Sequence, residues 1–250
     1  MSLDQFLDRA GDTTSSLVVV NRNQPLPVQR MLEKLFDGQP VAVEESDIPG
    51  EEDAVLLVRG GEVVASSPLS AVMDAVLLVN SDLFITGSRD LADAELPAVL
   101  DELEDTRFDV RGYPEAEKEK LLLIAVSRAI EREAWLADEG KVRSAFQRLS
   151  RMNDESGTRA VYETLADSDL DVHVYGVADW VPDSGFDVTA HAGYGDDFRK
   201  SWFVLHRLPG GGGSLLLAYQ TAPTTWSGFW TSDESLVEDV AAYSAGSSEP

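Results

Sequence analysis

The residues able to do acid–base or metal chemistry are few in this sequence. Its histidines are His173, His191 and His206, and no two of them are spaced as His-x-x-x-His. There is no cysteine, which excludes disulfides, thiolate nucleophiles and cysteine-ligated zinc or iron–sulfur centres. We therefore expect the histidines to be hydrogen-bonded structural residues, and we predict no metal site.

Motifs for nucleophilic catalysis and for phosphate binding are also missing. The sequence contains neither Gly-x-Ser-x-Gly, nor Gly-x-x-x-x-Gly-Lys-Ser/Thr, nor Gly-x-Gly-x-x-Gly. Carboxylates are so frequent that any one pair of them says little about glycosidase or acid–base chemistry. No catalytic residue is assigned, and a non-enzyme is predicted, with an uncharacterised hydrolase or transferase as the lesser alternative.

One feature that rises above this background is a polar pattern in the middle of the chain. The segments 127–135 and 143–151 are predicted to be helical. Arg128 with Glu131 or Arg132, and Gln147 with Arg151, then have spacings that share helical faces. Core packing with a solvated ion-pair face explains this pattern. The alternatives are a dimer seam or a polar network that transmits a change.

A second feature is the concentration of aromatic residues late in the chain. A concavity rich in aromatic side chains with a few polar groups suits a planar ligand, whereas tryptophans also fill the core of many antiparallel sheets. Together with the polar pattern, this set gives the predicted ligand-binding residues, which are His173, Tyr175, Asp179, Trp180, Trp202, Trp226, Trp230, Arg128, Glu131 and Gln147.

The charge of the chain restricts its environment and its partners. Asp and Glu number 45 against 20 Lys and Arg, for a net charge of −25. Such a surface repels itself unless concentrated salt screens it, so the composition predicts a salt-adapted protein; the acids alternate with apolar residues, unlike an acidic disordered tail. Nucleic-acid binding requires a basic footprint, so no direct nucleic-acid contact is expected. Without a long apolar run or a secretory signal, we expect a cytoplasmic protein with no membrane contact.

Hydrophobic periodicity and turn residues predict a mixed α/β (α+β) fold. An α/β amino-terminal region is expected over residues 1–112. Residues 113–250 are expected to form a helical segment followed by an antiparallel sheet with a covering helix, and the two parts could be one continuous domain. Within the first part, the glycine pair after Arg59 predicts a hairpin, and Ser67 is expected to cap the helix that follows. Residues 83–86 are predicted to form a short strand.

In the second part, a helix is predicted from Val142, and strands are predicted over 171–175, 186–191, 201–207 and 214–221. A final helix over 233–243 is expected to be capped by Ser232.

Several of these segments resemble the DICT family of sensory domains, which is found in cyanobacteria and salt-loving archaea beside diguanylate cyclases and two-component systems. The resemblance rests on 127–135, 143–151, Thr158-Arg-Ala-Val-Tyr-Glu-Thr-Leu and Asp171-Val-His-Val-Tyr-Gly-Val-Ala-Asp-Trp, and it extends to segments near both ends of the chain. The positions that carry it are Ser127, Arg128, Glu131, Phe146, Gln147, Arg151, Tyr162, His173, Tyr175, Gly176 and Asp179.

The resemblance implies a sensory role in signal transduction, in light or redox responses, for a family without an established ligand. We therefore predict a non-enzymatic domain that binds a small ligand or a partner protein and relays a conformational change. The expected partner is a separate signalling protein of the two-component or transcription-regulator type. A homodimer is possible, and a dimerisation scaffold is the alternative function. The cofactor is unknown; without cysteine, a bilin cannot be attached through a thioether.

Overall fold

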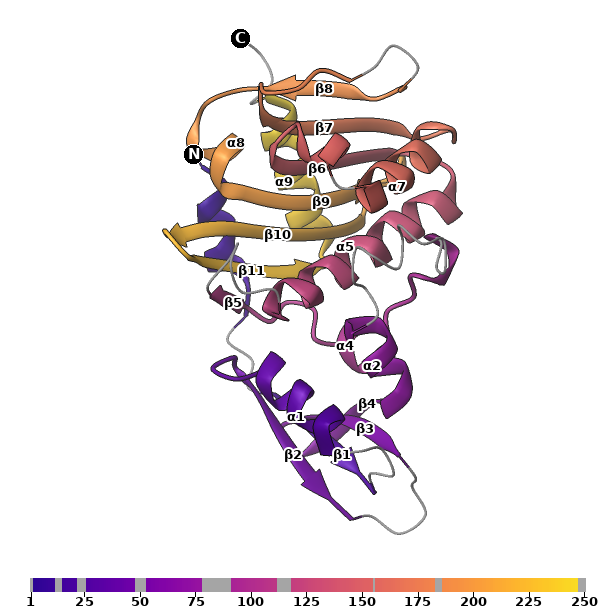
Figure 1. The fold of residues 1–250 in the computed structure, drawn as a ribbon, viewed down its shortest axis with the longest axis vertical. Helices are drawn as coiled ribbons and strands as arrows, with labels where there is room; N and C mark the ends of the chain where they lie inside the picture. Colours follow the sequence, from indigo (N-terminus) through magenta and orange to yellow (C-terminus); the bar gives the residue numbers. More distant parts are fainter. Residues whose placement is uncertain are drawn as a thin grey trace.

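The structure is a computed structural model that describes residues 2–11, 15–21, 26–47, 53–77, 91–111, 118–154, 156–182 and 186–246. Its strands form a seven-stranded and a four-stranded sheet, which lie toward opposite ends of the long axis of the molecule (Figure 1). Helices flank both sheets, so the predicted mixed α/β class is confirmed. No helix within the described ranges is both long and apolar enough to traverse a bilayer.

The seven-stranded sheet holds the strands that carry most of the predicted site. In spatial order its strands are β5 (Phe108–Arg111), β11 (Thr225–Thr231), β10 (Gly213–Ala222), β9 (Ser201–Arg207), β6 (Lys141–Arg148), β7 (Asp171–Val177) and β8 (Thr189–Ala192). Pairing is antiparallel from β5 through β6, and β7 and β8 then extend the sheet as parallel strands. Helix α7 (Ser156–Ala166) connects β6 to β7, as a parallel pair requires a crossover.

Alternation along the strands gives the sheet two buried faces. In β9, Val204 packs into one hydrophobic cluster with α5 (Lys118–Ala137), whereas Phe203 and Leu205 pack into another with α9 (Glu234–Gly246) and the 3-10 helix η1 (Leu3–Arg9). This period of two is the ordinary geometry of a strand covered on both sides. We call these surfaces the α5 face and the α9 face.

The four-stranded sheet has the order β2 (Val41–Ser46), β1 (Ser15–Val20), β3 (Ala54–Arg59) and β4 (Glu62–Pro68), with helices α1 (Leu26–Leu35) and α2 (Leu69–Leu77). The predicted hairpin joins β3 to β4, and Gly60 and Gly61 turn it with φ of 62° and 85°. The remaining helical turns are η2 (Leu91–Asp93), α4 (Ala98–Asp101), α6 (Arg151–Asp154) and α8 (Asp196–Lys200). Leu17 of β1 and Leu122 of α5 belong to the same hydrophobic cluster.

The helix predicted from Val142 was wrong, because this segment is strand β6. β6 lies between β9 and β7 and is buried on both faces, so polar and apolar residues do not alternate cleanly along it. Arg143 and Gln147 have the same spacing in the sequence as residues one turn apart on a helix, which favoured the wrong prediction. Strand β11 was not predicted, and the strand predicted at 83–86 lies outside the described residues.

Two predicted helix caps were also assigned to the wrong residues. Ser67 lies within β4, next to its end. Its Oγ accepts a hydrogen bond at 3.2 Å from the backbone N–H of Val99, which belongs to α4 and not to α2. In the first turn of α9 the Leu236 N–H donates to Asp233 Oδ1 at 2.8 Å. Ser232 instead donates its hydroxyl to Glu104 at 2.6 Å.

Candidate functional site: the two faces of the large sheet

The structure distributes the predicted ligand-binding residues over separate places instead of gathering them in one pocket. His173 and Tyr175 lie in β7, and Tyr175 packs into the cluster of the α9 face. Three predicted residues of the α5 face belong to another hydrophobic cluster: Trp226 and Trp230 are each 4% exposed, and Trp202 packs against them partly buried.

Arg128 and Glu131 belong to a buried polar network that joins α5, α7 and β6. The Arg128 guanidinium donates to the Glu131 carboxylate through Nη1 and to Thr158 Oγ1, at 3.0 Å, through Nη2. Tyr162 of α7 donates to Ser144 Oγ of β6 at 2.5 Å. Burial and the charge of Glu131 raise the pKa of Tyr162 well above its ordinary value, so its phenol stays a neutral donor.

Other positions that carry the family resemblance stabilise the segment that follows β6, through hydrogen bonds and close packing. Asp179, beyond the end of β7, accepts hydrogen bonds from Arg148 Nε at 2.7 Å and from Ser150 N and Oγ, both at 2.9 Å. Burial works against the charge of Asp179, but these bonds outweigh it and lower the pKa of the carboxyl. Gly176 lies close to the backbone of Leu149, because a Cβ at Gly176 would be 2.8 Å from Leu149 N.

Two further predicted residues also have structural contacts. Gln147 has φ of 58° and donates through Nε2 to Ser201 O at 2.6 Å, which ties β6 to the start of β9. Trp180 packs partly buried against the cluster around α7.

A cluster of titratable side chains lies on the α9 face at the β8 end of the sheet. We call Arg143, His173, Tyr175 and His191 the histidine cluster. His173 Nδ1 and His191 Nε2 are 2.8 Å apart, and the Tyr175 ring stacks on His191 with centroids 4.5 Å apart and planes 13° from parallel. Arg143 Nη1 donates to the Tyr175 hydroxyl. Parallel pairing of β7 with β8 sets this contact, because Tyr175 is registered opposite His191.

The electrostatics of the cluster keep both imidazoles neutral near pH 7. Burial, then the neighbouring His173 and Arg143, lower the pKa of His191 to about 4. Burial also lowers the pKa of His173, although Asp171 opposes the shift. His173 Nε2 lies 3.1 Å from Asp171 Oδ1, which favours the tautomer protonated at Nε2 and makes Nδ1 the acceptor from His191.

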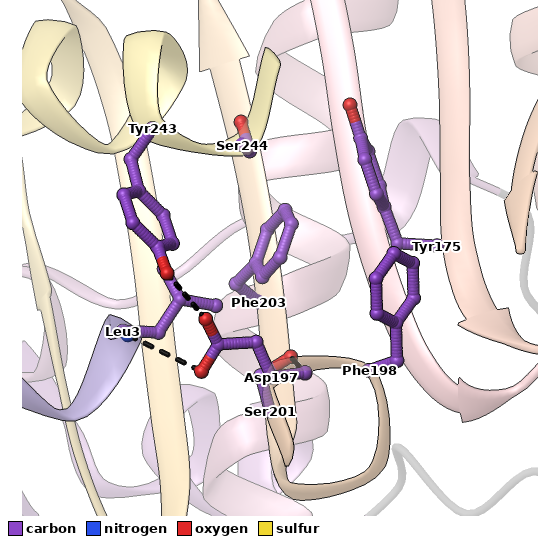
Figure 2. A pocket seen from close by; sticks show the side chains of 8 residues that line it. All are labelled: Leu3, Tyr175, Asp197, Phe198, Ser201, Phe203, Tyr243 and Ser244. Carbon is purple, nitrogen blue, oxygen red and sulfur yellow. Dashed lines mark hydrogen bonds between the residues drawn. The ribbon is translucent and has the colours of Figure 1, made fainter. Parts of the chain in front are cut away.

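A small pocket adjoins the cluster between the sheet, α8 and α9 (Figure 2). Tyr175 and Phe203 form its floor, and Phe198 and Tyr243 close it from the helices. The Asp197 carboxylate accepts from the Leu3 N–H at 3.3 Å and from the Tyr243 hydroxyl at 2.6 Å. The volume is about 20 Å³, enough for about one water molecule.

Arg143 and His191 were missing from the predicted site. Arg143 was placed in a helix, and His191 meets His173 only through a parallel pairing across a loop, which single-sequence patterns do not reveal. The alternation of His173 and Tyr175 within one strand was the available signal. Among the described residues, no group of three or more His, Asp or Glu side chains is placed to hold a metal ion.

Acidification from pH 7 to pH 5 is expected to lower the free energy of unfolding, and His191→Gln is expected to remove part of that loss. The pKa of His191 is about 4 in the folded protein against 6.5 ordinarily. Between these values the unfolded chain binds more protons, so stability falls as pH falls. Urea denaturation of both proteins at the two pH values, in molar KCl, measures the difference. An identical loss in both would contradict the expectation.

Comparison with known proteins adds a family and a weak structural similarity. Residues 98–221 match the family model described as DICT, "Sensory domain in DIguanylate Cyclases and Two-component system". No curated protein matches the sequence. A crystal structure of polyphosphate kinase from Porphyromonas gingivalis is similar with a TM-score of 0.39 and 15% identity, over 62% of this chain and 26% of that chain. The chain therefore spans about a quarter of that enzyme's length.

Proposed function

We propose that the protein is a non-enzymatic sensor, because residues 98–221 match the model of the DICT family of sensory domains. Its histidine cluster receives a signal, and helices α8 and α9 pass the signal to a separate signalling protein. A ligand or a partner group that hydrogen-bonds His191 competes with the His173–His191 bond. Losing that bond releases the ring that stacks on Tyr175, and the change reaches the helices that close the adjoining pocket.

The observation that carries the proposal is the unbroken series of contacts from the sheet edge to these helices. His191 stands in β8, bonded to His173 and stacked on Tyr175. Tyr175 lines the pocket together with Phe198 of α8 and Tyr243 of α9. The link from β8 to α8 is tight as well, since a Cβ at Gly193 would lie 2.4 Å from the Phe198 ring.

The volume of the pocket supports a relay rather than a reaction. A space of about 20 Å³ holds about one water molecule and leaves no room for a substrate inside the pocket. The imidazoles are bonded to each other, so neither is oriented toward a nucleophile.

Strand β8 is a suitable surface for the partner. Within the described part of the chain it pairs only with β7, so its outer edge carries unpaired backbone groups. Its sequence, Thr-Ala-His-Ala, has none of the lysines or prolines that protect many edge strands. A strand of a partner added at this edge would lie beside His191. The same edge favours the second candidate function, a dimerisation scaffold, in which two copies pair through β8.

We further propose that the chain works as one continuous domain. The four-stranded sheet and the large sheet share a hydrophobic cluster through α5, in which Leu17 and Val55 accompany Leu122 and Val126. Concentrated salt is the proposed medium, since it screens the net charge of −25.

His191→Gln is expected to raise the hydrogen-exchange rates of α8 and of the last turns of α9, while the rates in α5 stay unchanged. The substitution removes the imidazole ring that stacks on Tyr175 and pairs with His173, so the helices that close the pocket should open more often. Exchange measured by mass spectrometry in molar KCl detects this, with Thr189→Ala on the exposed part of the same strand as control. A change confined to β8, or an equal change in the control, would refute the relay.

A further inference from the structure

Three cationic side chains lie on the α9 face of β6 and β9, at the histidine cluster. Strand β6 directs Lys141 and Arg143 to this face, and β9 directs Arg207 to it, because side chains two residues apart lie on one side of a strand. Lys141 Nζ lies 2.5 Å from Asp171 Oδ2, and Arg207 Nε lies 2.8 Å from Glu238 Oε2. Arg143 differs from both, because it forms no ion pair with any described residue.

Arg143 is a buried guanidinium with most of its hydrogen-bonding capacity unused. The residue is 8% exposed, and its one hydrogen bond within the described ranges is the bond that Nη1 donates to the Tyr175 hydroxyl. The Nε–H and one Nη2–H lie side by side on a guanidinium, and this pair of donors matches two oxygens of one anion. A buried cation without a counter-ion is unfavourable for folding, so an anion bound to these donors would stabilise the site.

His191 offers a hydrogen-bond acceptor beside the same tyrosine. Its Nε2–H donates to His173 Nδ1, so its own Nδ1 carries a lone pair, and no described residue donates to that atom. The His191 ring stacks on Tyr175, whose hydroxyl is the partner of Arg143. The two groups are near enough for the charge of Arg143 to contribute to the lowered pKa of His191.

The unbonded atoms of Arg143 and His191 are accessible to solvent. The fully buried nitrogen and oxygen atoms that lack a partner in the described part of the chain include neither Arg143 Nε and Nη2 nor His191 Nδ1, so these atoms keep some accessible surface. Helix α9 packs chiefly on β9 and β10, and the β8 end of the sheet extends beyond it. Since the adjoining pocket holds about one water molecule, only a small ion suits this place.

We infer that the ligand of the histidine cluster is a small tetrahedral oxyanion that carries a hydroxyl, as hydrogen phosphate does. Two of its oxygens accept from the Nε–H and Nη2–H of Arg143, and its hydroxyl donates to His191 Nδ1. A carboxylate or a sulfate ion has no hydrogen for Nδ1 at neutral pH, and chloride lacks the two oxygens that match the paired donors. The inference rests on the proposed function for the place of the ligand, but binding does not require the relay through α8 and α9.

Calorimetric titration of the full chain with potassium phosphate in molar KCl at pH 7 tests the inference, with potassium sulfate as an ion of the same shape. Saturable binding is expected for phosphate. Sulfate should bind at least about tenfold more weakly, because its oxygens have no hydrogen for the lone pair of His191 Nδ1. Arg143→Lys keeps the charge but loses the paired donors, so it should weaken phosphate binding at least about tenfold. Arg159→Lys, the same change on the exposed side of α7, should leave it unchanged.

His191→Phe provides a second test, because it keeps a ring against Tyr175 but removes the acceptor. Phosphate and sulfate should then bind equally well. Absence of saturable phosphate binding to the wild type would overturn the inference, as would sulfate binding as tightly as phosphate. It would also fail if a folded Arg143→Lys variant bound phosphate as tightly as the wild type. The comparison of the two ions on the wild type decides the question even if a variant does not fold.

Hydrogen exchange separates this inference from the proposed relay. Phosphate binding that leaves the exchange rates of α8 and α9 unchanged would contradict the relay and support the oxyanion site. Absence of phosphate binding, together with faster exchange of these helices in His191→Gln, would overturn the oxyanion site and support the relay.

Discussion

Glu131→Ala is expected to lower the free energy of unfolding by about 3–5 kcal/mol, because it leaves the buried Arg128 guanidinium without its carboxylate. The Glu131 side chain is 1% exposed and that of Arg128 is 10% exposed, so water cannot replace the lost partner easily. Urea denaturation monitored by circular dichroism in molar KCl measures the loss.

The chain supplies a matched control for this substitution. Arg159 and Glu163 form a pair on the exposed side of α7, where Glu163→Ala should change stability by only about 0.3–0.5 kcal/mol. The double variant Arg128→Met/Glu131→Leu should recover much of the loss, since it removes both buried charges. If Glu131→Ala were as mild as Glu163→Ala, the network would not hold α5 to α7 as described.

Gly140→Ala is expected to destabilise the protein by about 3 kcal/mol or more. Gly140 connects α5 to β6 with φ of 97°, and a Cβ there would lie 2.3 Å from the backbone oxygen of Arg207 in β9. Backbone strain and crowding each contribute roughly 1–3 kcal/mol. The same denaturation experiment measures the sum.

Two other glycines separate these contributions. Gly212 has φ of 75° but nothing within 4 Å of the added Cβ, so Gly212→Ala reports strain alone. Gly195 has φ of −65° and the same open space, so Gly195→Ala should be nearly neutral. If Gly140→Ala lost no more stability than Gly212→Ala, the close approach to Arg207 would not be a determinant of the fold.

Local signals predicted an element correctly where its own residues determine its structure, and failed where packing against other elements determines it. The glycine pair at 60–61 and the apolar run of β9 are decided by nearby residues, and both predictions are confirmed. β6 was mistaken for a helix because neighbours on both faces, rather than its own sequence, make it a strand. Trp226 and Trp230 were noticed as aromatic residues, but their place in a strand was missed, because β11 contains Ser227 and Gly228 and lacks a simple apolar pattern.

The residues of the candidate site show the same difference between local and long-range signals. His173 and Tyr175 were selected from one strand, where alternation places them on one side. Their neighbours come from other strands: Arg143 lies 30 residues before His173, and His191 lies 16 residues after Tyr175. The family resemblance pointed to Arg128, Gly176 and Asp179, which the structure places in the packing that supports the sheet.

The two ends of the chain complete the large sheet, although both lie outside the segment that matches the family. η1 and α9 cover the α9 face, and β11 separates β5 from β10. A fragment cut at residues 98 and 221 would expose Phe203, Leu215 and Leu217 to solvent and detach β5. Any transplant of this sensor into another protein must therefore carry its amino-terminal segment along with its last helix, since the borders of sequence similarity are narrower than the folding unit.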